Sequence, residues 1–313
     1  MTFIHLLKNE HIGYLSAIIA AILFGSVSTI TKPVLEDLNA LSVSSLTYII
    51  AGLSLIPFMK FSATNSSSST LESTNPSNTS KWTNNNKSYF LLLLTSLCGA
   101  VIAPSLFFYG LSNSSASDSS ILISGEVLFS ILLAIVFFNE KLIKREILAM
   151  ILVLIGIVIL TTNMQFFSSN SFLELNIGNI LVVGSALFWA LDNNISRILS
   201  KTIHIPKIIV LKTLIGGSLL FIITIIVFGL AEFDIDIIHV SYLVFAGSMG
   251  IGGSLFFFLH GLKRIGTVKT ILLFSTSSIF GIIFAKVFLN ENITIYQVIA
   301  VGVILSGCYL IKR

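Results

Sequence analysis

The sequence predicts an all-α integral membrane protein with ten transmembrane helices, arranged as two inverted five-helix repeats. Three observations support this prediction: an extreme apolar composition, ten apolar segments of spanning length, and a match of the chain to itself. Of the 313 residues, 55% are hydrophobic and 10% are charged, whereas a soluble domain carries about 25% charged residues. The mean hydropathy is +0.97. A soluble fold of this size cannot bury so much apolar surface and still present a polar exterior.

A spanning helix needs about 20 mainly apolar residues. The segments that meet this requirement are 12–31, 41–59, 89–110, 117–138, 145–163, 177–198, 207–229, 240–261, 268–289 and 295–311. Most of the gaps between them are short and polar. One gap, 61–88, is a long run rich in Ser, Thr and Asn that cannot build a core, so we expect a flexible loop there. The first repeat therefore covers 12–163, including this loop, and the second covers 177–312.

The basic residues predict the orientation. With the N-terminus in the cytoplasm, 15 of the 18 lysines and arginines lie on the cytoplasmic side, as the positive-inside rule requires. We therefore expect a multi-pass protein of the cell membrane with both termini cytoplasmic. Because the basic residues are spread over separate cytoplasmic segments, they form no stripe that would bind nucleic acid.

The internal repeat appears when the chain is shifted by 151 residues. Between 109 and 160 this shift gives 14 identities without a gap, including Asn139–Glu140 on Asn290–Glu291 and Gly156 on Gly307. The segments around 12–31 and 177–198 also correspond loosely. Because five is an odd number of spans, the second half enters the membrane from the opposite face, which is a recurring design of secondary transporters.

These motifs resemble the EamA-type drug/metabolite transporter superfamily. The phrases that carry the resemblance are VFFNEKL with IGIVIL, VFLNENI with LSGCYLI, and LFWALDNNISRILS. The resemblance covers about 14–162 and 178–311. It implies a 5+5 inverted arrangement around a central cavity, and alternating-access transport of small organic molecules. Export as the direction of transport comes from the resemblance alone. In one departure from symmetry, Glu126 of the first repeat corresponds to Ser277 of the second.

Glu126 is the leading candidate for a binding residue. By count it lies near the middle of the bilayer, where a charge costs at least about 2.5 kcal/mol. On a helix, Ser119, Ile123, Glu126 and Ser130 share one face, so the carboxylate lies on a semi-polar stripe. It could bind a substrate amine, carry a proton, or form a structural link between helices. We favour function, because ionisable groups inside a membrane are functional by default.

Asp192 and Asn193 lie in the inner half of the segment 177–198, and Trp189 and Asp192 share a helix face. This group either lines the cavity or its cytoplasmic gate, or Asp192 pairs with Arg197 or Lys201 near the membrane edge. Both interpretations remain open from the sequence.

Tyr109 and His260 occupy equivalent positions of the repeats, each before Gly-Leu. They are candidate gates, although interfacial anchoring explains Tyr109 and a surface position explains His260. Lys212 and Lys286 lie close to helix ends, where we expect both to extend to the interface.

Two acidic features are assigned structural roles. Glu140 and Glu291 begin the short links into 145–163 and 295–311, where a carboxylate complements a helix dipole. The segment 231–239 contains an Asp-x-Asp, which we interpret as an acidic, solvated outer loop rather than a metal site. We therefore expect neither a metal nor a cofactor.

The leading functional prediction is a secondary transporter that exports amino acids or related small metabolites by alternating access, and not an enzyme. The alternative is an intramembrane enzyme that acts on lipid-linked sugars or prenyl substrates. The expected partners are a small-molecule substrate and the lipid bilayer, with protons as the candidate coupling ion. The protein is expected to be a monomer or a homodimer.

Overall fold

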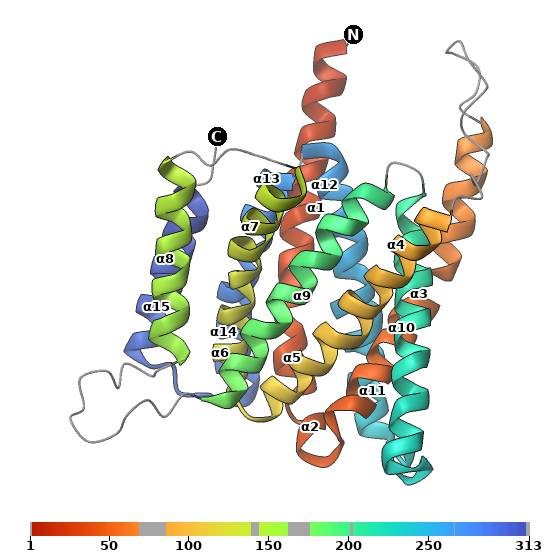
Figure 1. Ribbon diagram of the computed structural model, residues 1–313, viewed down its shortest axis with the longest axis vertical. Helices are drawn as coiled ribbons and strands as arrows, with labels where there is room; N and C mark the ends of the chain where they lie inside the picture. Colours follow the sequence, from red (N-terminus) through yellow and green to blue (C-terminus); the bar gives the residue numbers. More distant parts are fainter. Residues whose placement is uncertain are drawn as a thin grey trace.

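The computed structural model describes residues 2–68, 86–138, 144–161, 176–200, 203–265 and 267–310, and these residues form helices without a strand (Figure 1). The α-helices are α1 (Thr2–Thr31), α2 (Val34–Asp37), α3 (Ala40–Ser68), α4 (Asn86–Leu97), α5 (Ala103–Ser112), α6 (Ala116–Leu122), α7 (Glu126–Phe138), α8 (Lys144–Thr161), α9 (Ile177–Leu199), α10 (Ile205–Phe228), α11 (Ile237–Phe245), α12 (Ser254–Ile265), α13 (Thr267–Phe274), α14 (Ser277–Leu289) and α15 (Ile295–Leu310). Short π-helices, η1 (Cys98–Ile102) and η5 (Ala246–Gly253), and 3₁₀-helices, η2 (Ile123–Gly125) and η4 (Leu230–Phe233), connect some of them.

The helix interruptions fall at equivalent positions of the two halves. The 151-residue shift places η1 on 249–253, inside η5, and places 124–125 of η2 on the turn Ser275–Thr276 between α13 and α14. The segment 268–289, expected as one helix, is therefore two. Ser124 and Ser275 also meet in space, because the Ser124 hydroxyl donates to the Ser275 carbonyl at 3.3 Å. The repeat is thus visible in local backbone geometry as well as in residue identities.

The surface of the bundle is apolar. Five segments of the described chain are long and apolar enough to cross a membrane: Glu10–Asp37, Ala40–Phe58, Ser88–Ser112, Ile205–Phe228 and Ile237–Leu262. Shorter apolar helices cover Ile147–Leu160, Ser277–Phe288 and Ile295–Leu310. Large apolar side chains such as Ile226 and Phe288 are 77% and 70% exposed, which a soluble surface would not tolerate over so wide an area. The composition and the exposed residues agree on a membrane protein.

The interior, by contrast, is rich in small and hydroxyl residues. Ser44 and Thr47 are fully buried, and each hydroxyl donates to the carbonyl four residues earlier, at 2.6 and 2.7 Å. Such self-satisfied hydroxyls let helices approach closely where no hydrophobic effect between helices drives packing.

The helices pair in a pattern that survives exchange of the two halves. The first-half helix α1 packs on α12 and α14 of the second half, and the second-half helix α9 packs on α5 and α7 of the first half. The pairs α3–α10 and α8–α15 each join one helix from either half. Figure 1 shows α8 with α15 at one side of the bundle and α3 with α10 at the other.

A pair of glycines defines the contact between α8 and α15. A side chain on Gly156 would meet the Ala300 carbonyl at 3.1 Å, and one on Gly307 would meet the Ala149 carbonyl at 2.8 Å. The 151-residue shift turns Gly156 into Gly307 and Ala149 into Ala300. The contact is therefore isologous, the type formed between subunits related by a two-fold axis.

A set of polar contacts joins the helices at the lower end of the bundle in Figure 1, where α1 and α5 end and α6 begins. Lys32 Nζ donates to the carbonyls of Leu111 and Ser114 at 2.7 Å each, and to that of Ser112 at 3.2 Å. These carbonyls belong to the end of α5 and the turn after it, where helical partners are missing. Lys32 therefore ties the end of α1 to α5.

Glu291 and Gln297 extend these contacts to the second half. The Glu291 carboxylate accepts from the backbone N–H groups of Ala116 and Ser117 at 2.8 and 3.1 Å. It complements a helix dipole, as expected, but that of α6 rather than of α15. Gln297 Nε2 donates to Asp118 Oδ1 at 2.7 Å. We call this set the lower-end network: Lys32, Ser114, Ser117, Asp118, Glu291 and Gln297.

Two sequence predictions concern segments that the structure describes only in part or not at all. The loop expected at 61–88 is helical at its beginning, because α3 continues to Ser68, and α4 already starts at Asn86. The residues between them, and the pair Asn139–Glu140, lie outside the described residues.

The glycine contact predicts a stability difference within one helix. Gly307→Val adds bulk against the α8 backbone, and we expect it to destabilise the protein by about 1–3 kcal/mol. Gly302→Val is the matched control, because a side chain at Gly302 meets nothing within 4 Å. Melting temperatures in detergent should fall for the Gly307 variant and stay unchanged for the control. Equal melting temperatures would contradict the contact.

Candidate functional site

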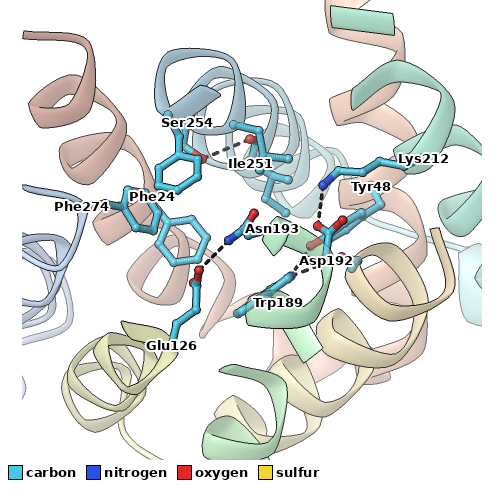
Figure 2. Close-up of a pocket in the computed structure, with 13 residues that line it drawn as sticks. Phe24, Tyr48, Glu126, Trp189, Asp192, Asn193, Lys212, Ile251, Ser254 and Phe274 are labelled. Atoms are coloured by element: carbon cyan, nitrogen blue, oxygen red, sulfur yellow. Dashed lines mark hydrogen bonds and ion pairs between the residues drawn. The ribbon is translucent and has the colours of Figure 1, made fainter. Parts of the chain in front are cut away.

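A cavity lies in the middle of the bundle, and both halves contribute to its wall. The space between its wall residues measures about 470 Å³, open solvent at its mouth included. Its wall residues come from α1, α3, η1, α7, α9, α10, η5, α12 and α13. They are Phe24, Tyr48, Gly99, Glu126, Trp189, Asp192, Asn193, Lys212, Ile251, Ser254, Leu255, Phe258 and Phe274. Figure 2 shows most of them converging on one space.

Glu126 reaches the cavity because of the helix interruption before it. It is the first residue of α7 and follows the 3₁₀ turn η2. The side chain is 6% exposed, and Oε1 accepts a hydrogen bond from Asn193 Nδ2 at 2.5 Å. The carboxylate of the first half is thus held by an amide of the second half.

Asp192 forms an ion pair that the sequence did not suggest. Its Oδ2 lies 2.5 Å from Lys212 Nζ, and both side chains are 2% exposed. Its Oδ1 accepts from the Ser196 hydroxyl at 3.0 Å. Asp192 was expected to pair with Arg197 or Lys201 if it formed an ion pair, and Lys212 was expected to extend to the interface. Instead, the partner that the structure gives is Lys212, buried two turns inside α10.

Gly99 allows this ion pair to form. It lies in the π-helix η1, and a side chain there would clash with the Asp192 carboxylate. A π-helical turn also changes the hydrogen bonding of its carbonyls, and the Gly99 carbonyl accepts from Trp189 Nε1 at 3.2 Å. The irregular backbone of α4–α5 therefore lines the cavity, which is where a membrane protein tolerates such geometry.

Aromatic rings form much of the remaining wall. Trp189 Nε1 also donates to the Tyr48 hydroxyl at 3.2 Å. The Trp189 ring packs edge-on against Phe24, with ring centres 5.8 Å apart. Phe274 packs against both Phe24 and Phe258, at 5.1 and 4.9 Å. Such a wall suits an apolar group or a cation that faces the rings.

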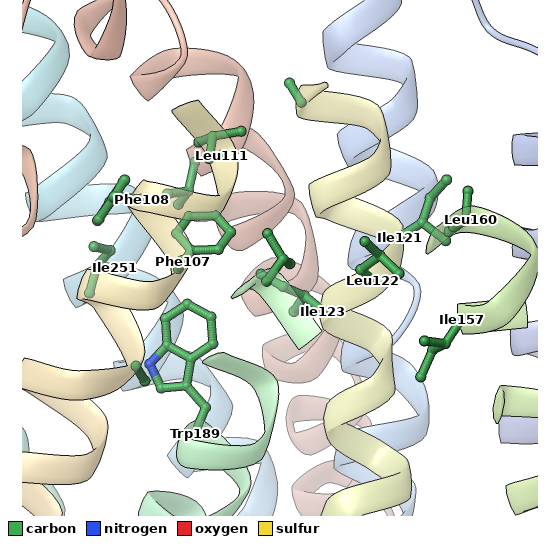
Figure 3. Close-up of a cluster of buried hydrophobic side chains, with 14 of the residues drawn as sticks. Phe107, Phe108, Leu111, Ile121, Leu122, Ile123, Ile157, Leu160, Trp189 and Ile251 are labelled. Carbon is green, nitrogen blue, oxygen red and sulfur yellow. The ribbon is translucent and has the colours of Figure 1, made fainter. Parts of the chain in front are cut away.

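An apolar cluster lies between the cavity and the lower-end network. Phe107 packs against Trp189 at 5.3 Å, and Leu111, one turn further along α5, gives its carbonyl to Lys32. Figure 3 shows these residues with Phe108 and Ile251, and a second group around Ile121 and Leu160. The cluster therefore extends from the cavity wall at Trp189 to the lower-end network at Leu111.

Three of the predicted binding residues do not line the cavity. Ser119, Ser130 and Ser277 are buried, at 0%, 7% and 3% exposure, but away from the cavity wall. The sequence argument assumed one regular helix from Ser119 to Ser130. η2 is a 3₁₀-helix, which has three residues per turn where an α-helix has about 3.6, so it rotates α7 relative to α6. The hydroxyls of Ser119 and Ser130 have no hydrogen-bond partner among the described residues.

The two candidate gates also lie apart from the cavity wall. Tyr109 is 37% exposed near the end of α5, and its hydroxyl donates to Asn39 Oδ1 at 3.4 Å. His260 in α12 is half-buried, with Nδ1 2.9 Å from the Phe256 carbonyl and its ring against the Phe256 ring.

Lys212 is the main residue of the cavity wall that sequence reasoning missed. Its distance from the helix end could have indicated burial. Lys212 follows Ile205, the first residue of α10, by seven positions, which is about 10 Å along a helix. Tyr48 and Phe24 were missed because aromatic residues are common in apolar helices and nothing local marks those that face a cavity.

The acidic segment after α10 gives no metal site in the described structure. The described residues contain no group of three or more His, Cys, Asp or Glu side chains that could hold an ion. His239 Nε2 lies 3.3 Å from Asp37 Oδ2 instead, at the lower end of the bundle. This pair joins the start of α11 to the end of α2.

Comparison with known proteins places the chain in a family. The model of the EamA-like transporter family matches residues 11–162 and 176–313. A protein described as an uncharacterized transporter of Methanothermobacter thermautotrophicus is 33% identical over 299 residues, which cover 96% of this chain and 85% of that protein. A crystal structure matches the fold with a TM-score of 0.67, at 14% identity and over 96% of both chains. The chain belongs to the EamA-like transporter family and is a multi-pass membrane transporter.

Proposed function

We propose that the protein is a secondary transporter that exports amino acids or related small metabolites by alternating access, with Glu126 as a substrate-binding or proton-binding group. The observation that carries the proposal is the central cavity. It places two carboxylates and one ammonium group where both halves of the chain meet, inside a bundle with an apolar surface. Buried charges of this kind in membrane proteins mark substrate and ion pathways.

The symmetry of the contacts supports alternating access. We propose ten spanning segments in two inverted halves, and the isologous glycine contact between α8 and α15 is what such an arrangement would produce. Gly156, in the second half of α8, contacts Ala300 near the start of α15, and Gly307, near the end of α15, contacts Ala149 near the start of α8. The two helices α8 and α15 therefore run antiparallel. Two similar halves of opposite orientation can exchange conformations, which would open the cavity to each side in turn.

The orientation follows from the basic residues. We propose that the ends of α1 and α15 that lie at the upper end of Figure 1 face the cytoplasm. In this proposal the lower-end network closes the outer side in the described conformation. Family membership favours transport over the enzymatic alternative, which no arrangement of the described residues favours.

Glu126→Gln tests the role of the carboxylate. The glutamine oxygen can still accept from Asn193, so we expect normal folding and expression. Loss of the charge removes a charge-assisted contact worth about 1.5–3 kcal/mol, so transport should fall about ten- to a hundredfold. Counterflow of radiolabelled amino acids and small metabolites in proteoliposomes measures this effect.

The matched control is Glu36→Gln, which neutralises an exposed carboxylate on α2 and should leave counterflow unchanged. If the Glu126 variant transports at the wild-type rate, the carboxylate has a structural role alone. If wild type transports no compound of the panel, the proposed substrate class is wrong.

Cross-linking at the lower end tests alternating access. In Lys32→Cys/Ser112→Cys, a short cleavable thiol cross-linker would join the end of α1 to α5, where Lys32 Nζ lies 3.2 Å from the Ser112 carbonyl in the wild type. We expect the cross-linked protein to stop transporting and to recover after reduction. Each single-cysteine variant serves as a control. Full transport by the cross-linked protein would show that the lower end need not open.

A further inference from the structure

We propose that Lys212 is the group that binds the carboxylate of the substrate, and that Asp192 occupies Lys212 while the cavity is empty. This inference rests on the proposed function, and it specifies the substrate class as zwitterionic amino acids with an apolar side chain.

The ion pair is costly where it lies. Asp192 and Lys212 are buried in the interior of a bundle that spans the membrane, and desolvation of two charges cancels much of their attraction. Replacing such a pair by apolar residues is often neutral or stabilising. Stability alone therefore does not explain the pair, and a role in the cavity that both residues line does.

The lysine has unused donors at the cavity wall. An ammonium group can donate three hydrogen bonds, and among the described residues the acceptor given to Lys212 Nζ is Asp192 Oδ2. The side chain is 2% exposed, so water outside the protein does not satisfy the remaining donors. A carboxylate that enters the cavity can use these donors directly.

The charged groups face each other across the cavity. Figure 2 shows Glu126 and Lys212 on opposite sides, with Asn193 between them. A zwitterion matches this arrangement: its carboxylate would bind the ammonium group of Lys212, and its own ammonium group would lie between Glu126 and Asp192. Asp192 then loses the lysine but gains the substrate ammonium, and it keeps the hydrogen bond from Ser196. The exchange leaves no buried charge without a partner.

The aromatic rings of the cavity wall indicate which kind of substrate side chain would fit. Phe24, Phe258 and Phe274 pack together on the wall that also contains Ser254. An apolar side chain on the substrate would lie against these rings. The three features together fit an amino acid such as leucine better than a simple amine or a simple acid.

The test measures binding by calorimetry with purified protein, using L-leucine and L-leucinamide. The two ligands share the ammonium group and the side chain, but leucinamide lacks the negative charge. We expect wild type to bind leucine about ten- to a hundredfold more tightly than leucinamide, the range of a charge-assisted hydrogen bond. In Lys212→Met/Asp192→Asn, which removes both charges together, this preference should disappear while leucinamide binding persists through Glu126.

The double variant avoids leaving Asp192 as an unpaired buried charge, which would threaten folding. Lys286→Met, at an exposed position of α14, is the control and should keep the wild-type preference. An unchanged preference in the double variant would overturn the role of Lys212. If wild type binds neither ligand, leucine-like zwitterions are not substrates and the inference fails. The proposed function is judged separately by counterflow with the wider panel.

Discussion

The structure depends on one constraint: the backbone polar groups and the charges inside the membrane must find partners within the chain. Helices satisfy this constraint for the backbone, and buried hydroxyls satisfy it by bonding to their own helix, as Ser44 and Thr47 do. Charged groups need a partner on another helix. The places where helices are interrupted, η1, η2, η5 and the turn after α13, lie around the cavity or beside it, so the irregular backbone and the charged side chains occupy the same region.

The global features of the fold were predictable from the sequence because they depend on properties summed over many residues, such as composition and hydropathy. Composition and segment length reveal a membrane protein, and a shift of 151 residues reveals the repeat. Glu126 was found because a single carboxylate in an apolar run is visible without any structure. Asp192 and Asn193 were found for the same reason. These are the residues whose local sequence context is unusual.

The remaining parts of the site depend on contacts between distant segments. Nothing near Lys212 indicates that Asp192, twenty residues earlier, lies beside it, and the preference of lysine for the interface argued against burial. Glu291 looked like a residue that complements its own following helix, but it binds the start of α6. Ser119 and Ser130 were grouped with Glu126 by regular helix geometry, and the η2 turn separates them. In each case the deciding fact is a helix packing or a break that periodicity cannot reveal.

The two halves of the chain are similar in their packing and different in their chemistry. The glycine contact between α8 and α15 obeys the symmetry closely, whereas Glu126 has Ser277 at its equivalent position. Two identical five-helix subunits that assembled through the same contact would carry that carboxylate twice or not at all. Joining the halves in one polypeptide removes this restriction, so that the frame can remain symmetric while one half specialises. An acidic residue that is present in one half and absent from the equivalent position of the other is therefore a property that a fused chain can evolve and a homodimer of half-length chains cannot.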